Sequence, residues 1–228
     1  MMTRTHWAAV TAVVLALLFA AGAVTLAAGN GNGGEGGGSA AAGRTPAGDS
    51  ADAGFARDMS VHHQQAVEMS FLVRDRTKDE EVRRLAYDIA NTQANQRGMM
   101  LGWLDLWGLP KHSPDEPMAW MAAGDSSGRG DHGGHGSYEA RDGALMPGMA
   151  TRAELTELRA ADGRKAEILY LQLMTDHHKG GVAMAQGCAD RCGVAPERSL
   201  AQGMVDAQES EIKLMADLLK ARGAAPRP

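Results

Sequence analysis

Apolar residues recur along residues 55–75 at the three- and four-residue spacing of a helix, and neither glycine nor proline interrupts this stretch. The pattern Thr77-x2-Glu80 resembles a capping box and predicts the start of a second helix, which can run to Trp107. No window of the chain shows the sustained alternation of apolar and polar residues that is typical of a strand. The first part of the folded chain is therefore predicted to be a helical hairpin.

The C-terminal part of the chain has a similar pattern. The capping pattern Thr151-x2-Glu154 predicts a short helix. A longer helix follows it to about Gly187. Pro196 is a favourable first-turn residue and opens the last helix, which ends near Gly223.

These two hairpins repeat each other in sequence. Residues 55–108 and 170–223 align without a gap at a constant offset of 115 (170 − 55), and 14 of the 54 aligned positions are identical. A repeat that stays in register through two helices indicates an internal duplication. Two antiparallel hairpins bury their apolar faces best against each other. The sequence thus predicts an all-α fold over residues 55–222, a four-helix bundle made of two duplicated helical hairpins.

Three other segments depart from this pattern. Residues 1–28 contain an uncharged stretch from Trp7 to Ala28 behind a basic flank, which indicates an export signal, either a cleaved signal peptide or a retained membrane anchor. Residues 29–54 are rich in glycine and predict a flexible linker, with the folded domain outside the cytoplasm. Residues 109–148 interrupt the repeat and predict a flexible crossover between the hairpins.

Composition narrows the class of protein. The chain has 23 Lys+Arg and 28 Asp+Glu, a formal net charge of -5, which argues against a nucleic-acid-binding protein because such proteins need a basic surface. Aromatic residues make up only 4% of the chain while Met occurs 14 times, which favours close-packed helices over sheets. Two cysteines cannot form a four-cysteine zinc site. The eight histidines are the informative residues, because four of them occur as two His-His pairs.

The histidine pairs lie on one face of each predicted helix. At 100° per residue this face is about 120° wide and should point into the bundle. In the two halves it carries Met59, His62, His63, Ala66 and Met69, and Met174, His177, His178, Gly181 and Met184. The partner helices present two further stripes, Gln93, Gln96 and Met100, and Met204, Gln208, Glu211 and Met215.

This set of side chains predicts a metal site. Neutral imidazole binds copper, zinc, nickel and iron, while thioether sulfur selects Cu(I). A purely structural bundle gains nothing from four inward imidazoles that each need a polar partner. Outside the cytoplasm thiolates tend to oxidise, so methionine is the more durable soft ligand. The mixture indicates copper, as Cu(I), Cu(II) or both, and the competing interpretation is a set of satisfied core histidines.

Two interpretations remain open for the methionines and glutamines of the partner helices. For Met100, Met204 and Met215, core packing is favoured over metal binding. Gln93 and Gln208 are expected to hydrogen-bond the histidine rings, although bonding between helices explains them nearly as well.

Three further features lie beside these stripes. His132 and His135 fit a solvated glycine-rich loop better than a metal-scavenging one. The interior pair Gly180-Gly181 indicates either a functional site or a close helix approach. For Cys188-x3-Cys192 a local disulfide is favoured over a thiolate copper site, and the turn would have to leave helical geometry there.

Four motifs together resemble a known family. They are Met-x2-His-His-x3-Val in both halves, the Gln-x6-Met stripe, Trp103-Leu104-x2-Trp107-Gly108 and Met146-Pro147-Gly148-Met149. The chain is similar to the exported, ferritin-like family catalogued as domain of unknown function 305. The resemblance implies a ferritin-like four-helix bundle and copper binding outside the cytoplasm. It implies as ligands Met59, His62, His63, Met69, Met174, His177, His178 and Met184.

The chain departs from the family pattern in two places. Ala166 and Glu167 stand where the family has Phe and Asp, and Gln96 stands where its counterpart Glu211 keeps the expected acid. These departures affect the surroundings of the expected ligands more than the ligands themselves.

The sequence therefore predicts an exported copper-binding protein, either membrane-tethered or secreted, that serves copper sequestration, transfer or resistance and catalyses no reaction. The expected partners are the metal ion, the membrane through the N-terminal segment, and a second copy of the chain or a copper donor or acceptor. One alternative is a ferritin-like metal-dependent oxidoreductase, disfavoured because the chain lacks the Glu-x2-His motif of di-iron bundles. The other is a tethered interaction module with structural histidine pairs.

Overall fold

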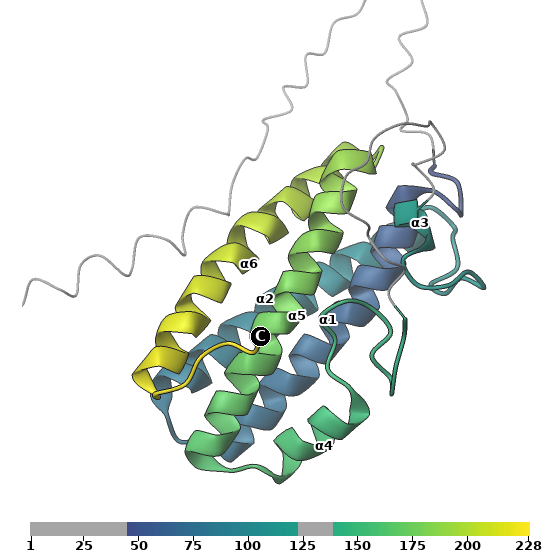
Figure 1. Cartoon of the computed structure of the whole chain (residues 1–228). Helices are drawn as coiled ribbons and strands as arrows, with labels where there is room; N and C mark the ends of the chain where they lie inside the picture. Colours follow the sequence, from purple (N-terminus) through teal and green to yellow (C-terminus); the bar gives the residue numbers. More distant parts are fainter. Residues whose placement is uncertain (1–44, 123–138) are drawn as a thin grey trace, which may run out of the picture. The chain divides into compact units, whose positions relative to one another are not determined.

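The structure, a computed structural model, describes residues 45–122 and 139–228, and throughout these residues the only regular elements are helices. Four long helices lie side by side as a bundle (Figure 1), and two short ones flank them. The long helices are α1 (Ala51–Arg76), α2 (Glu80–Leu106), α5 (Gly163–Arg191) and α6 (Ala195–Ala221), and the short ones are α3 (Ala119–Ala122) and α4 (Arg152–Ala160). The predicted all-helical fold is confirmed.

The closest helix packing is within each hairpin, α1 with α2 and α5 with α6, and α1 with α5 joins the two hairpins. No helix among the described residues is both long and apolar enough to span a membrane. The predicted export segment, residues 1–28, lies outside the described residues, as do His132 and His135 of the crossover.

The ends of the helices correct two details of the sequence analysis. Helix α1 begins at Ala51, within the segment predicted to be linker, because Ser50 caps it by accepting a hydrogen bond from the Ala53 backbone N–H at 3.2 Å. Helix α2 is not capped by Thr77. Its N-cap is Asp79, whose carboxylate accepts from two backbone N–H groups of the first turn. Thr77 instead donates its hydroxyl hydrogen to Glu167 at 2.5 Å.

Helix α6 takes its cap from another helix. Val194, at its N-cap position, has no side chain that could accept a hydrogen bond. The carboxylate of Asp52 in α1 accepts from the backbone N–H groups of Gly193 (3.0 Å) and Val194 (2.7 Å) instead. This contact joins the first turn of α1, which begins four residues before the predicted start, to the N-terminus of α6, and Asp52 is buried there.

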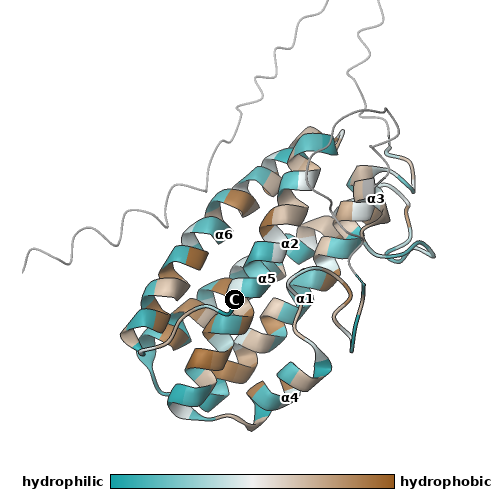
Figure 2. Cartoon of the chain, in the orientation of Figure 1, coloured by the Kyte–Doolittle hydropathy of each residue, from teal (hydrophilic) through white to brown (hydrophobic). Residues whose placement is uncertain are grey.

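The core has two hydrophobic clusters. The disulfide cluster includes Phe55, Trp120 and both cysteines, and the tyrosine cluster includes Tyr170, Ile89 and Leu219. Along every long helix, members of the two clusters are separated by polar residues; Figure 2 shows this mixture of hydropathies along the ribbons. We call the separating residues the polar layer: His62, His63, Gln93, Gln96, His177, His178, Gln208 and Glu211.

Candidate metal centre

Both histidine pairs lie inside the bundle and meet at its centre. All four side chains are 0% exposed. The rings of His62 and His177 stack with centroids 3.8 Å apart and planes inclined by 35°. The rings of His177 and His178 have centroids 6.3 Å apart. The two halves of the repeat therefore contribute to one shared polar layer.

Each ring is oriented by a hydrogen bond at Nε2. In the first half, His62 bonds the Pro147 carbonyl at 3.2 Å and His63 bonds Gln96 Oε1 at 2.9 Å. In the second half, His177 bonds the His62 carbonyl at 3.0 Å and His178 bonds Glu211 Oε2 at 2.7 Å. Carbonyl and carboxylate oxygens only accept, so Nε2 carries the hydrogen in all four rings.

This tautomer leaves Nδ1 of every ring as a lone pair. Within the described residues, none of the four buried Nδ1 atoms has a hydrogen-bond partner. A buried polar atom without a partner costs about 1–3 kcal/mol. A metal-binding histidine typically donates its other N–H to an oxygen, which fixes the ring and the tautomer. All four rings have this arrangement.

Three of the rings, those of His62, His63 and His177, are held neutral. Burial lowers the pKa of His62 to about 4, against the weaker opposite effect of its bond to Pro147. Burial, reinforced by the neighbouring His62, lowers the pKa of His63 to about 3. Burial and the other rings likewise lower the pKa of His177 well below its usual value. Neutral imidazole is the form that binds a metal.

The methionines of the two motifs are buried on both sides of the polar layer. Met59 and Met184 belong to the disulfide cluster, together with Met100 and Met204. Met69 and Met174 belong to the tyrosine cluster, together with Met215. Because α1 and α5 run in opposite directions, the first methionine of one motif lies in the same cluster as the last methionine of the other. Each cluster thus combines sulfur from both halves.

The prediction for Gln93 and Gln208 needs correction. Neither hydrogen-bonds a histidine ring, and in the described residues both polar atoms of the Gln93 amide, and Oε1 of Gln208, have no partner. The bonds to the rings come from Gln96 and Glu211, one helical turn further along.

The end of the predicted flexible crossover, and the residues that directly follow it, are packed against α1 and α5. Gln65 holds the backbone of Ala150 with two hydrogen bonds, of 2.9 and 2.6 Å. A Cβ on Gly180 would lie 1.9 Å from the carbonyl oxygen of Pro147, so only glycine admits this close approach. The sequence analysis missed Pro147 as a partner of His62. The Met146-Pro147-Gly148-Met149 motif was the available signal, because Gly148 adopts a positive φ of 79° that other residues rarely take.

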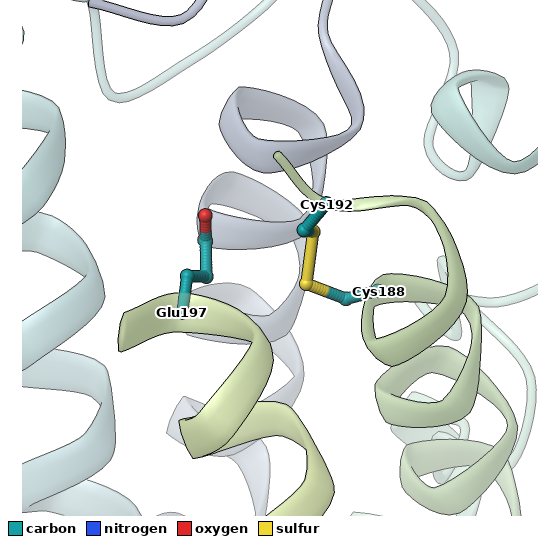
Figure 3. Close-up of side chains that lie close together, drawn as sticks. All are labelled: Cys188, Cys192 and Glu197. Carbon is teal, nitrogen blue, oxygen red and sulfur yellow. A yellow bond between two sulfur atoms is a disulfide. The ribbon is translucent and has the colours of Figure 1, made fainter. Parts of the chain in front are cut away.

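The four histidines do not by themselves form a complete coordination sphere. Among the described residues, the only three His, Cys, Asp or Glu side chains with ligand atoms all within 4.8 Å of one another are Cys188, Cys192 and Glu197 (Figure 3). The two cysteines are joined in a disulfide, as the sequence analysis favoured, and Cys192 has left helical geometry. A metal held by the histidine pairs would therefore need sulfur from the adjacent methionines or a small movement of the rings.

The chain matches one protein family, both by its sequence and by its structure. A family model described as "Domain of unknown function (DUF305)" matches residues 52–219. None of the curated proteins matches. A structure of a candidate secreted DUF305 protein from Streptomyces coelicolor is 64% identical, with a TM-score of 0.69, and the match covers 80% of this chain and 99% of that one.

Two more distant structures share the fold. A DUF305 fragment from Deinococcus radiodurans is 28% identical, with a TM-score of 0.58, over 75% of this chain and 96% of that one. CopM in its Cu(I)-bound form is 19% identical, with a TM-score of 0.54, over 75% of this chain and 96% of that one. CopM has also been solved in Cu(II)-bound and Ag-bound forms.

Proposed function

The chain belongs to the DUF305 family, and from this membership and the buried histidine pairs we propose that it is an exported copper-binding protein that sequesters or transfers copper. The observation that carries the proposal is the common state of the four rings. Each donates its Nε2 hydrogen to an oxygen and keeps a buried Nδ1 lone pair without a partner among the described residues.

Copper suits the neighbouring atoms better than other first-row metals do. Thioether sulfur is a soft ligand that selects Cu(I), and imidazole binds both Cu(I) and Cu(II). Met59 and Met184 on one side of the layer, and Met69 and Met174 on the other, are fully buried. We assign these four methionines and the four histidines as the copper ligands. CopM, which shares the fold, binds Cu(I) and Cu(II).

Export is the second part of the proposal. The uncharged stretch from Trp7 to Ala28, which follows Arg4, supports it. The disulfide in the folded part supports it as well, since disulfides persist in oxidising compartments. The similar Streptomyces coelicolor protein is described as a candidate secreted protein. We propose that the segment directs the folded domain outside the cytoplasm and, where it is retained, holds the domain near the membrane.

Equilibrium dialysis of the full chain with Cu(I) and with Cu(II) tests the proposal. The test variant replaces the four buried histidines with leucine, which fills the interior without a nitrogen ligand, and the control variant replaces His132 and His135 with alanine. Wild type and control should bind copper, and the leucine variant should not. Copper at about 100 times its Kd should also raise the unfolding free energy by about 2.7 kcal/mol. Equal copper binding by wild type and the leucine variant would reject the proposal.

A second measurement tests how the sulfur ligands pair. Methionine to leucine keeps the volume and costs less than about 1.5 kcal/mol of stability. If each copper uses one cluster, the effects of Met59→Leu and Met184→Leu on affinity should be coupled in a double-mutant cycle. The effects of Met59→Leu and Met69→Leu should add, because these residues lie in different clusters.

Oxygen uptake by the copper-loaded chain would instead favour the alternative function, a metal-dependent oxidoreductase.

A further inference from the structure

The turn between α5 and α6 holds a second group of potential ligands, which begins ten residues after His178 along the chain. Figure 3 shows Glu197, at the start of α6, beside the Cys188–Cys192 disulfide. One carboxylate oxygen and the two sulfur atoms lie within 4.8 Å of one another, and all three residues are buried. None of these residues takes part in the proposed copper site.

The first half of the repeat shows that the fold does not require these residue types. At the offset of 115, Cys188 corresponds to Val73, Cys192 to Thr77 and Glu197 to Val82. Val73 and Val82 are fully buried members of the tyrosine cluster, and Thr77 ends α1. The same turn can therefore be built with no ligand at all. The second half has a potential ligand at each of the three positions.

Glu197 has an unfavourable position in this structure. Its side chain is 0% exposed and lies against the carboxyl group of Asp52. Burial, followed by the charge of Asp52 and a hydrogen bond between the two carboxyl groups, raises the pKa of Glu197 to about 9. Two carboxyl groups buried side by side cost folding free energy, and a bound cation would offset part of that cost.

We propose that reduction of the Cys188–Cys192 disulfide converts this turn into a binding site for a borderline divalent cation such as Zn²⁺, held by both thiolates and the carboxylate of Glu197. Two thiolates and one carboxylate form a ligand set that zinc accepts, and three protein ligands leave one coordination position open. The disulfide and the metal site exclude each other, because the same two sulfur atoms form either one.

The conversion has two steps, reduction of the disulfide and binding of the cation. A dithiol reductant breaks the S–S bond, is oxidised to its own disulfide, and leaves its two hydrogens on Cys188 and Cys192. The cation then displaces the two thiol protons and the proton of Glu197, so that three protons are released to solvent. The cation itself is neither oxidised nor reduced.

Cobalt titration of the full chain tests this site. Co²⁺ replaces Zn²⁺ as a probe because thiolate-to-Co²⁺ charge transfer absorbs light and identifies sulfur ligands. The protein is reduced without oxygen by a phosphine, which becomes a phosphine oxide with oxygen from water and whose product does not compete as a thiol. Reduced wild type should bind one Co²⁺ with this absorption, and Zn²⁺ should remove the band. The oxidised protein should show no band.

The first half supplies the matched control. A variant with Cys188→Val, Cys192→Thr and Glu197→Val carries the residues of the first turn and should stay helical without the band. Glu197→Gln should keep the thiolate absorption but bind Co²⁺ more weakly, because the amide lacks the negative charge of the carboxylate. Cys188→Val with Cys192→Thr, which lacks any disulfide, reports whether the fold survives without the bond.

Three results would overturn the inference. They are a folded, reduced wild type without the band, a triple variant that still shows it, and a Glu197→Gln variant with wild-type affinity. The variant without the four buried histidines should keep the band. Failure of this site and failure of the proposed copper site are thereby distinguished.

Discussion

The two halves of the bundle place equivalent side chains at equivalent positions and surround them differently. In the first half, His63 bonds the neutral amide of Gln96, whereas in the second half His178 bonds the carboxylate of Glu211. On α1, Gln65 holds Ala150, just after the crossover, whereas its counterpart on α5 is Gly180, which lets Pro147 of the crossover approach. The histidine pairs are thus the same in both halves of the repeat, whereas their surroundings differ.

Acid should have the largest effect, because it acts on the rings of both halves. The unfolded chain protonates its histidines near pH 6.5, whereas in the folded state His62 and His63 stay neutral down to about pH 4 and about pH 3. The unfolded state then binds more protons, so stability is complete above about pH 6.5 and falls as the pH is lowered toward 4. The loss is about 1.4 kcal/mol per pH unit for each such histidine.

Urea unfolding of the metal-free chain between pH 7 and pH 4 measures this loss. The variant with leucine at the four buried histidines should lose most of the pH dependence, which assigns the loss to the rings. A wild-type stability that does not change over this range would contradict the neutral state assigned to them.

Gly180→Ala should have the next largest effect. It tests the contact between α5 and the crossover without changing α1. Its Cβ would lie 1.9 Å from the carbonyl oxygen of Pro147, so the crossover must move. We expect a net loss of about 2 kcal/mol in the free energy of unfolding. Because Pro147 accepts the hydrogen bond from His62, copper affinity should fall as well.

The control for this substitution is Gly98→Ala in α2, where a Cβ would meet no atom within 4 Å. It should stabilise the chain by about 0.5–1 kcal/mol through helix propensity. Thermal and urea unfolding of both variants measure the difference. A Gly180→Ala variant as stable as the Gly98→Ala variant would show that the crossover does not pack against α5.

The smallest expected effect comes from exchanging the acceptors of the two halves. Glu211→Gln gives the second half the amide of the first, and Gln96→Glu does the reverse. A carboxylate acceptor makes a metal-bound imidazole more basic, so Glu211→Gln should weaken copper binding about tenfold and Gln96→Glu should strengthen it. Competition titrations with a copper chelator measure both. Equal affinities in wild type and both variants would show that the acceptor does not affect the rings.

The features that could be predicted from the sequence are those that follow from a regular spacing of residues. The helical face of Met59, His62, His63 and Met69 follows from a regular spacing, and all four side chains are buried as predicted. The all-helical fold followed from the same spacing and from the repeat, and the favoured disulfide from the cysteine spacing and the export signal.

Contacts that leave no regular spacing in the sequence were not predicted. The Pro147 carbonyl reaches His62 from a segment without regular structure, and a backbone acceptor leaves no trace in residue type. Asp52 falls within the predicted linker because residues 29–54 have a glycine-rich composition. Its carboxylate nevertheless caps a helix and bonds a residue 142 positions away in the sequence. The ring partners were displaced from Gln93 to Gln96 because spacing fixes the face of a helix but not the height at which two helices meet.

The crossed arrangement of the sulfur atoms has a consequence for the origin of the chain. Met59 shares its cluster with Met184 rather than with Met69, so neither cluster is complete in a single hairpin. An ancestral peptide with one hairpin could have assembled both clusters only as a symmetric homodimer. In a single fused chain the two copies are free to differ, as the acceptors Gln96 and Glu211 do.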